Sequence, residues 1–92
     1  MCRNIRMLFN FEPPSTDEEV RAAALQYVRK VSGATKPSRA NQAAFDHAVE
    51  EMFKVTRALV DGLQTEAHPH TREEQAAKAR ARSAKRFAPR QA

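Results

Sequence analysis

Ninety-two residues allow one small domain with a thin core, which must come from aliphatic residues, methionine and phenylalanine because tryptophan is absent and tyrosine occurs once. Only two glycines and many Ala, Glu, Lys, Arg and Gln residues favour helix over strand. A single cysteine excludes an internal disulfide and predicts a cytoplasmic protein, and we find neither a signal peptide nor the roughly 20 apolar residues of a membrane span.

The net charge of +5 lies entirely in the last quarter of the chain. Residues 1–70 hold nine basic and nine acidic residues, whereas residues 71–92 hold seven basic residues against Glu73 and Glu74. This distribution predicts a neutral domain over residues 1–70 and a basic C-terminal helix or tail over residues 71–92.

The first segment is apolar and ends at Pro13-Pro14. Alternate residues from Ile5 to Phe11 are apolar, as on one face of a strand, yet the chain offers no second strand to pair with it. A short helical turn and an extended arm are the other interpretations. We expect an arm that covers the helices with four apolar side chains, those of Ile5, Leu8, Phe9 and Phe11.

Two helices are predicted next, over about 16–32 and 39–63. Thr16 and Glu19 form a capping box for the first, and Gly33 is a typical residue after a helix end. Ser38 or Asn41 is the expected side-chain cap of the second helix.

Apolar residues recur at helical spacing in both helices, so we predict an antiparallel pair that buries one stripe against the other. The first stripe contains Val20, Ala24, Tyr27, Val28 and Val31. The second contains Phe45, Ala48, Val49, Met52, Thr56, Leu59 and Leu63, and is widened by Phe53, Val55 and Val60. Glu50 and Lys54 on the second helix are spaced for an i,i+4 ion pair.

A third helix is expected over about 72–87, with Thr71 and Glu74 as its capping box. This segment is rich in alanine and poor in large apolar residues, so we expect it to pack weakly or to project. Basic residues fall largely on one side of it, beside a ridge of alanines, and such a stripe is typical of a helix that lies along a phosphate backbone. The alternatives are a solvated basic helix docked through its alanines and a partly disordered tail.

Cys2 is the candidate nucleophile if the chain is an enzyme. Removal of Met1 would place the α-amine of Cys2 beside its thiol, and a nearby cation such as Arg3 favours the thiolate. The alternative is a small residue packed against the apolar segment that follows.

The histidines do not predict a metal centre. His68 and His70 lie in a loop and His47 lies on the second helix, without the spacing of a zinc site, so no metal and no cofactor are expected. There is no glycine-rich phosphate loop, and a membrane-surface role is not expected because the third helix lacks large apolar residues opposite its cations.

Five stretches of the chain are characteristic: "MCRNI", "LFNFEPP", "AAALQYVRKVSG", "KPSRANQAAF" and "AAKARARSAKRF". Together they resemble the domain of unknown function 2277 family of small bacterial proteins, across nearly the whole chain. The resemblance implies a mostly helical, cytoplasmic bacterial protein and brings no activity, substrate or catalytic residue. Cys2, Arg3 and Asn4 match the opening motif of the family, which makes Cys2 a better candidate for testing.

The sequence thus predicts an all-α protein, a small antiparallel helical hairpin covered by an extended N-terminal arm, plus a basic C-terminal helix. The leading hypothesis is a non-enzymatic binding protein that contacts nucleic acid through Lys78, Arg80, Arg82, Lys85 and Arg86. A thiol-dependent enzyme that uses Cys2 and a helical adaptor that binds another protein or a second copy are the alternatives, so whether the chain is an enzyme stays open.

Overall fold

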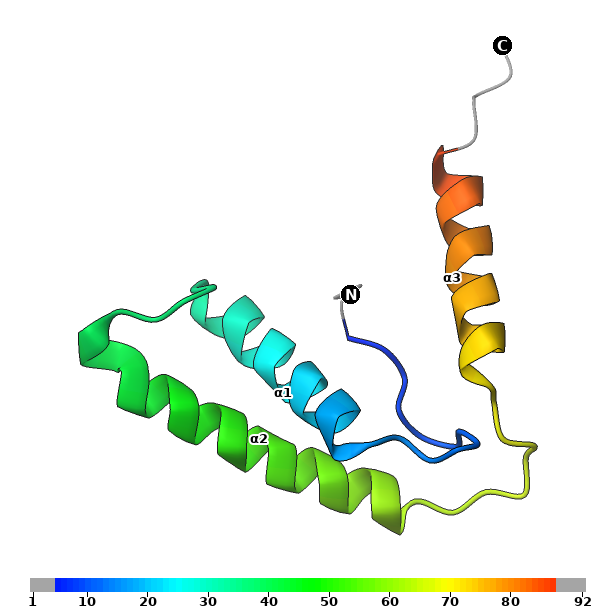
Figure 1. The fold of residues 1–92 in the computed structure, drawn as a ribbon, viewed down its shortest axis with the longest axis horizontal. Coiled ribbons are helices and arrows are strands. Elements are labelled where there is room, and N and C mark those ends of the chain that lie inside the picture. The colour runs from blue at the N-terminus through cyan, green and yellow to red at the C-terminus, as the bar shows by residue number, and fades with distance from the viewer. Residues whose placement is uncertain (1–4, 88–92) are drawn as a thin grey trace.

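The computed structural model of the chain describes residues 5–87, which form an all-α fold (Figure 1). Its elements are α1 (Asp17–Ser32), a short 3-10 helix η1 (Arg39–Asn41), α2 (Gln42–Gly62) and α3 (Arg72–Phe87). The predicted fold class is confirmed. Within residues 5–87 the only strand-like pairing is an isolated bridge between Phe11 and His70. None of the described helices is both long enough and apolar enough to traverse a bilayer.

Local signals define both ends of α1. The Thr16 hydroxyl accepts a hydrogen bond from the Glu19 amide, and the Glu19 carboxylate accepts one from the Thr16 amide, which confirms the predicted capping box. At the other end, Gly33 adopts a left-handed conformation with φ of 71° and donates its N–H to the Arg29 carbonyl. Glycine reaches this conformation without the steric cost that a Cβ imposes, so α1 ends there.

The start of α2 differs from the prediction. Neither Ser38 nor Asn41 caps the helix with its side chain. Instead, the Asn41 amide donates to the Ser38 carbonyl at 3.0 Å, which closes the turn of η1 in front of α2. Backbone groups of this 3-10 turn thus lead into the helix in place of a side-chain cap.

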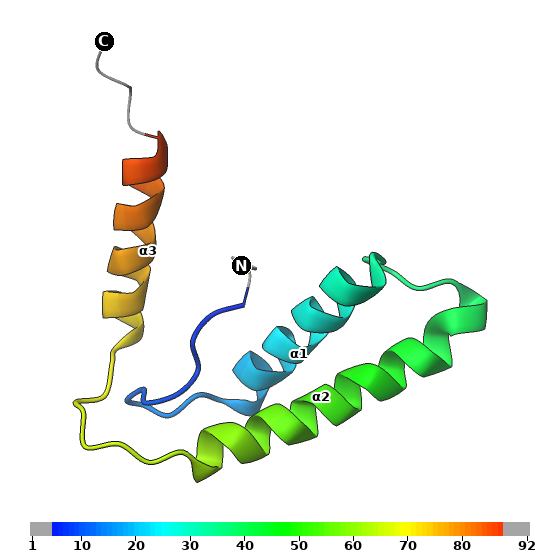
Figure 2. The same cartoon turned by 180° about the vertical axis from the view of Figure 1, so that it is seen from behind.

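The α1–α2 hairpin contains most of the core. The two helices run antiparallel, and their buried residues are Val20, Ala24 and Val28 from α1 and Phe45 from α2 (Figures 1 and 2). Val20 is the one large side chain among the described residues with no exposed surface. Such a core is thin even for a small domain, so each buried side chain carries a large share of the stability.

Polar side chains also connect the two helices. Arg21 on α1 forms an ion pair with Glu50 on α2, and its guanidinium lies 4.3 Å from the centre of the Phe53 ring. The predicted Glu50–Lys54 pair is therefore wrong, because Lys54 lies 3.6 Å from Glu51 instead. Both pairs are solvent-exposed, so they define geometry more than they stabilise the fold.

The molecule is a thin layer from which α3 projects (Figures 1 and 2). Its principal extents are 51 × 41 × 16 Å, and its radius of gyration is 16.3 Å, against about 12 Å for a compact domain of this length. Helix α3 packs against neither α1 nor α2. The fold thus has one helical layer where a typical domain has two.

The N-terminal arm lies between α1 and α3 (Figure 1). Phe11 is buried, while Ile5, Leu8 and Phe9 are half-buried and Met7 is 53% exposed. The Ser15 hydroxyl, itself buried, donates to the Leu8 carbonyl and folds the arm back on the start of α1.

Candidate functional site

The basic residues of α3 lie on a helix that projects into solvent. Lys78, Arg80, Arg82 and Lys85 are all exposed, and none of them forms an ion pair with another described residue. Arg86 also belongs to α3, and its side chain lies outside the described part of the structure. The acidic residues of the helix, Glu73 and Glu74, are both in its first turn.

Helical geometry divides these cations between two sides. At 3.6 residues per turn, Lys78, Arg82 and Lys85 fall within an arc of about 60°. Arg80 points about 160° away from Arg82. Three of these four exposed cations, Lys78, Arg82 and Lys85, therefore lie on one stripe, which we call the cationic stripe, and Arg80 lies on the opposite side.

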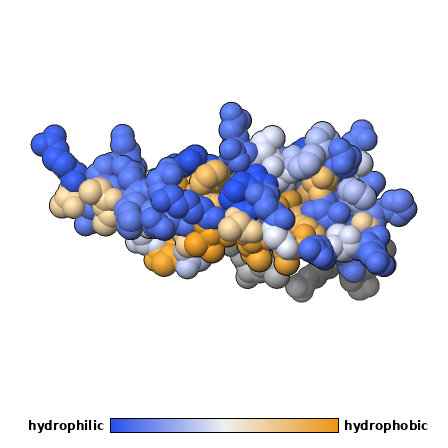
Figure 3. All heavy atoms as spheres, turned by 90° about the horizontal axis from the view of Figure 1, so that it is seen from below, coloured by the Kyte–Doolittle hydropathy of each residue, from blue (hydrophilic) through white to orange (hydrophobic). Residues whose placement is uncertain are grey.

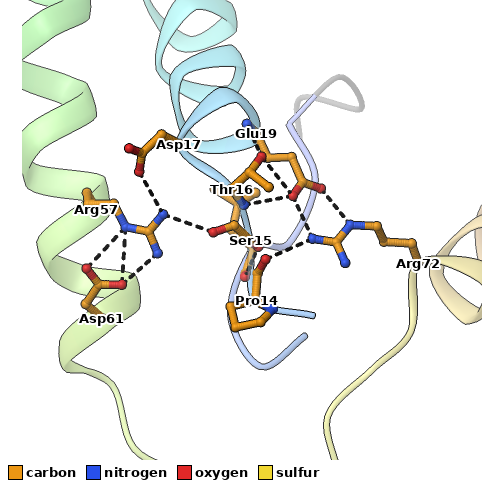
Figure 4. A network of polar contacts seen from close by, with 9 residues as sticks. Pro14, Ser15, Thr16, Asp17, Glu19, Arg57, Asp61 and Arg72 are labelled. Carbon is orange, nitrogen blue, oxygen red and sulfur yellow. Dashed lines mark hydrogen bonds and ion pairs between the residues drawn. The ribbon is translucent and has the colours of Figure 1, made fainter. Parts of the chain in front are cut away.

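Arg72 attaches the base of α3 to the start of α1 (Figure 4). Its Nε lies 3.0 Å from Glu19 Oε2 and its Nη2 lies 2.7 Å from Glu19 Oε1, so the two side chains form a bidentate ion pair. The same guanidinium donates to the carbonyls of Pro13, at 2.8 Å, and Pro14, at 3.2 Å. Because arginine offers five N–H groups in a fixed plane, this one side chain connects the base of α3 both to α1 and to the end of the arm.

Glu19 has two roles, since it caps α1 and also accepts from Arg72. The hydrogen bonds from Arg72 and then from the Thr16 amide lower the pKa of this carboxyl to about 2 from 4.5. The Glu19 carboxylate raises the pKa of Arg72 in turn. The junction between α1 and α3 is thus a charged hydrogen-bond network that needs an ionised Glu19.

The arm and the loop before α3 also pair through their backbones. The His70 amide donates to the Asn10 carbonyl at 2.7 Å, and the Glu12 amide donates to the His70 carbonyl at 3.0 Å. The Phe11 ring lies 5.6 Å from the imidazole of His70 and 5.8 Å from the guanidinium of Arg72. Phe11 therefore packs at the base of α3, whereas the sequence led us to expect it over the hairpin.

A second arginine holds the other side of the same segment (Figure 4). Arg57 on α2 donates from Nη1 to the Ser15 carbonyl at 3.0 Å and to Asp17 Oδ1 at 3.3 Å. Its Nε and Nη2 bind Asp61, which raises the pKa of Arg57. Residues 13–17 are thus held between an arginine from α2 and an arginine from α3.

Neither arginine was singled out from the sequence. Arg72 follows Thr71 as an ordinary first residue of a helix, and Arg57 interrupts an apolar stripe. The one signal for Arg57 was that interruption, since a cation beside the core needs a partner of opposite charge.

An apolar groove of about 590 Å³ opens where α1, the following loop and α2 meet. Tyr27 and Val31 line it from α1, and Ala44, Ala48 and Met52 line it from α2. Tyr27 and Val31 were predicted to be core residues, yet they are 44% and 69% exposed. The groove is lined by one acidic side chain, Glu51, and by no basic one, so an anionic ligand has no cationic partner there.

The remaining predicted site residues are not brought together. Cys2 lies outside the described residues. His47 and His68 are exposed, while His70 is half-buried in the contact with Phe11. Within residues 5–87, no three His, Cys, Asp or Glu side chains are grouped so that they could hold a metal ion.

Comparison with known proteins gives one match. Residues 1–78 match the model of a family described as "Uncharacterized conserved protein (DUF2277)". No curated protein and no solved structure matches the chain. The match ends at Lys78, so most of the cationic stripe lies beyond it.

Proposed function

The chain belongs to the DUF2277 family of uncharacterised conserved proteins, and from that premise we propose that it is a non-enzymatic protein that binds nucleic acid through α3. The proposal comes from the residues of α3, because the family description names no activity. Its contacts are the cationic stripe of Lys78, Arg82 and Lys85, while Arg86 and, from the opposite side of the helix, Arg80 add to the positive charge.

One observation carries the proposal: after the first turn of α3, its described cations, Lys78, Arg80, Arg82 and Lys85, are exposed and form no ion pair with another described residue, on a helix that leaves the rest of the fold. After Glu74 the sequence contains no acidic residue, whereas residues 1–70 hold as many acidic as basic residues. Unpaired cations on a projecting helix approach a polyanion without first breaking internal ion pairs, and they displace its counterions on contact.

The mode of binding follows from the side chains that α3 has. The described side chains of α3 include no aromatic residue that could stack on a base. Lysine and arginine contacts to phosphates carry no sequence information by themselves. We therefore propose binding that depends on salt and is indifferent to sequence.

The division of labour is part of the same proposal. In this proposal, residues 1–70 are a helical domain that carries the binding segment, residues 71–92. Arg72 sets the direction of that segment. We propose a cytoplasmic location on the ground of the single cysteine.

The test is a salt titration of binding to a short DNA duplex and to single-stranded RNA. The variant Lys78→Gln/Arg82→Gln/Lys85→Gln removes the cationic stripe. Its matched control, Lys30→Gln/Lys36→Gln/Arg39→Gln, removes three exposed cations from the far end of the hairpin. Both proteins have the same net charge, so any difference between them reports position.

The expected result is a loss of at least about tenfold in affinity at low salt for the α3 variant. The slope of log K against log salt should also become shallower by about 2 to 3, roughly one per lost phosphate contact. The control should keep most of the wild-type slope. Equal losses in both variants, or no binding by the wild type at low salt, would overturn the proposal.

A further inference from the structure

An apolar seam on α2 has no partner in the described structure. It consists of Ala48, Met52, Val55, Leu59 and Gly62, and we call it the outer seam. Val55 is 62% exposed and Leu59 is 57% exposed, and neighbouring Leu63 is 46% exposed. The alternating steps of four and three residues are those of a helix that packs along its whole length on a second helix.

The side of α2 that faces α1 carries a different set of residues, namely Phe45, Val49, Phe53, Thr56 and Val60, which are buried or half-buried. At 3.6 residues per turn, the mean directions of the two sets differ by about 100°. A helix with two apolar sides near a right angle has the geometry of a corner in a four-helix bundle. One neighbour, α1, occupies the first side, and the second side is open.

No described segment of the chain covers that side, where Val55 and Leu59 stay exposed. Helix α3 holds no large apolar side chain from Arg72 to Lys85. In the N-terminal arm, Phe11 is already buried against His70 and Arg72 at the base of α3. Seen edge-on in Figure 3, apolar residues gather mainly toward one side of the thin layer and hydrophilic residues line the other.

The exposed area is larger than a compact monomer of this size should have. The chain exposes 7690 Å², whereas a folded monomer of 10.4 kDa exposes about 5,400 Å². Part of the excess of about 2,300 Å² belongs to projecting α3, yet a standard interface needs only about 800 Å² from each partner. An excess of this size over the whole chain leaves room for one interface of standard size.

The outer seam is complementary to itself when two copies of α2 run antiparallel. A two-fold axis between Phe53 and Lys54 places Met52 opposite Val55 of the second copy. The same axis places Leu59 opposite Ala48 of the second copy, and Leu63 opposite Ala44. Large side chains from the end of one α2 thus face small ones at the start of the other, which is how packed layers interdigitate.

The apolar groove lies where these leucines would enter. Ala44 and Ala48 line the groove at the start of α2, together with Tyr27 and Val31 of α1. Leu59 and Leu63 protrude at the other end of α2. Because the groove and the leucines lie on the same surface, a two-fold axis brings the leucines of each copy to the groove of the other. Such a contact is isologous and is complete in a dimer.

We propose that the protein is a homodimer in which the outer seams of two α2 helices pack antiparallel and the two hairpins form a four-helix bundle. Leu59 and Leu63 of each copy fill the apolar groove of the other. The dimer is independent of nucleic-acid binding, since α3 takes no part in the seam.

The test measures the molar mass of the full chain by sedimentation equilibrium from micromolar to hundreds of micromolar concentration. The wild type should have the mass of a dimer. Val55→Glu places a charge in the seam and should raise the dimer dissociation constant at least about a hundredfold. The matched control is Ala43→Glu, an exposed position about 140° away from the seam on the same helix, and it should stay dimeric.

A charge exchange tests the antiparallel direction and guards against variants that simply fail to fold. Met52→Glu and Val55→Lys should each prevent self-association, and their equimolar mixture should form a heterodimer because residue 52 of one copy meets residue 55 of the other. A parallel seam pairs equal residue numbers and gives no such rescue. A wild type that stays monomeric, or a mixture that fails to associate, would overturn the proposal and assign the groove to another occupant.

Discussion

Helices α1 and α3 have the same length and nearly the same beginning, yet one is packed and the other projects. Each has 16 residues and follows a threonine whose hydroxyl accepts a hydrogen bond from the amide of a glutamate three positions on; the first turn holds three acidic residues in α1 and two in α3. They differ at the fourth and twelfth positions, where α1 has Val20 and Val28 and α3 has Gln75 and Ser83, while the eighth position is alanine in both. Capping and propensity therefore suffice to make a helix, and a few apolar side chains at helical spacing decide whether it packs.

The attachment of the two helices differs in the same way. Helix α1 is held along its length by α2, whereas α3 is held at its base by Arg72 and by Gln75, which donates to the Met7 carbonyl at 3.2 Å. Burial of apolar area stabilises a whole helix cooperatively, while exposed polar contacts stabilise only the turn that makes them. The comparison predicts that changes in α1 affect global stability and that equivalent changes in α3 stay local.

The largest effect is expected when α1 receives the residue that α3 has at the same position. Val20→Gln should lower the free energy of unfolding by about 3–5 kcal/mol, because it loses the burial of valine and leaves an amide without partners in the core. That amount is close to the whole stability of a small domain, so the variant should be largely unfolded by circular dichroism. Ala22→Gln, an exposed site on the same helix, is the control, and similar losses in both variants would show that Val20 is not the centre of the core.

Acid should weaken the junction between α1 and α3. The folded pKa of Glu19 is about 2 and lies below its ordinary value of 4.5, so this carboxylate stabilises the fold above that value. The stabilisation should be lost as the pH falls from 4.5 toward 2. Because the Glu19 side chain is 38% exposed, we expect about 1 kcal/mol, well below the full linkage value.

The measurement compares urea unfolding of the wild type and Glu19→Gln at neutral pH and at acid pH. The variant should already lack this contribution at neutral pH and should lose about 1 kcal/mol less than the wild type on acidification. Parallel pH profiles would mean that the ionised Glu19 carboxylate, which also caps α1, contributes nothing to the stability of the hairpin.

Sequence reasoning succeeded where the relevant signal was local. The Thr16–Glu19 box and the Gly33 end of α1 involve residues three or four positions apart, and both were predicted. It failed at the start of α2, where a backbone turn replaced the expected side-chain cap of Ser38 or Asn41. A turn of this kind is chosen by the path of the loop, which no short motif encodes.

Contacts between distant residues were the ones that the sequence could not predict. Arg72 reaches Glu19 across 53 positions, and Arg57 reaches the Ser15 carbonyl across 42. Glu50 pairs with Arg21, 29 positions away, although Lys54 stood at the ideal helical spacing. For the candidate site, the sequence predicted that α3 is basic and has few large apolar residues. The direction in which the helix projects depends on contacts between distant residues, which the sequence did not predict.

Equivalent substitutions at the caps of α1 and α3 should have different effects on the global stability of the protein. Thr16→Ala removes the cap of α1 and should lower the global free energy of unfolding by about 1 kcal/mol. Thr71→Ala removes the corresponding contact, in which the Glu74 amide lies 3.1 Å from the Thr71 hydroxyl. Because α3 is not packed on the hairpin, that variant should reduce the helical signal at 222 nm without moving the urea midpoint. Equal shifts of the midpoint would place α3 in the same cooperative unit as α1.

The smallest effect is expected for loss of the Arg72 contacts, and it should be confined to the first turns of α3. Substitutions of two arginines on that helix, Arg72 and Arg80, test this prediction. Arg72→Ala removes the contacts to Glu19, Pro13 and Pro14 and should speed amide hydrogen exchange in the first half of α3 by roughly three- to tenfold. Arg80→Ala deletes the same side chain from a position without such contacts, and alanine keeps the helix propensity high, so exchange there should be unchanged. Faster exchange throughout the hairpin in Arg72→Ala would show that the junction supports the core, whereas unchanged exchange in α3 would show that the helix directs itself without Arg72.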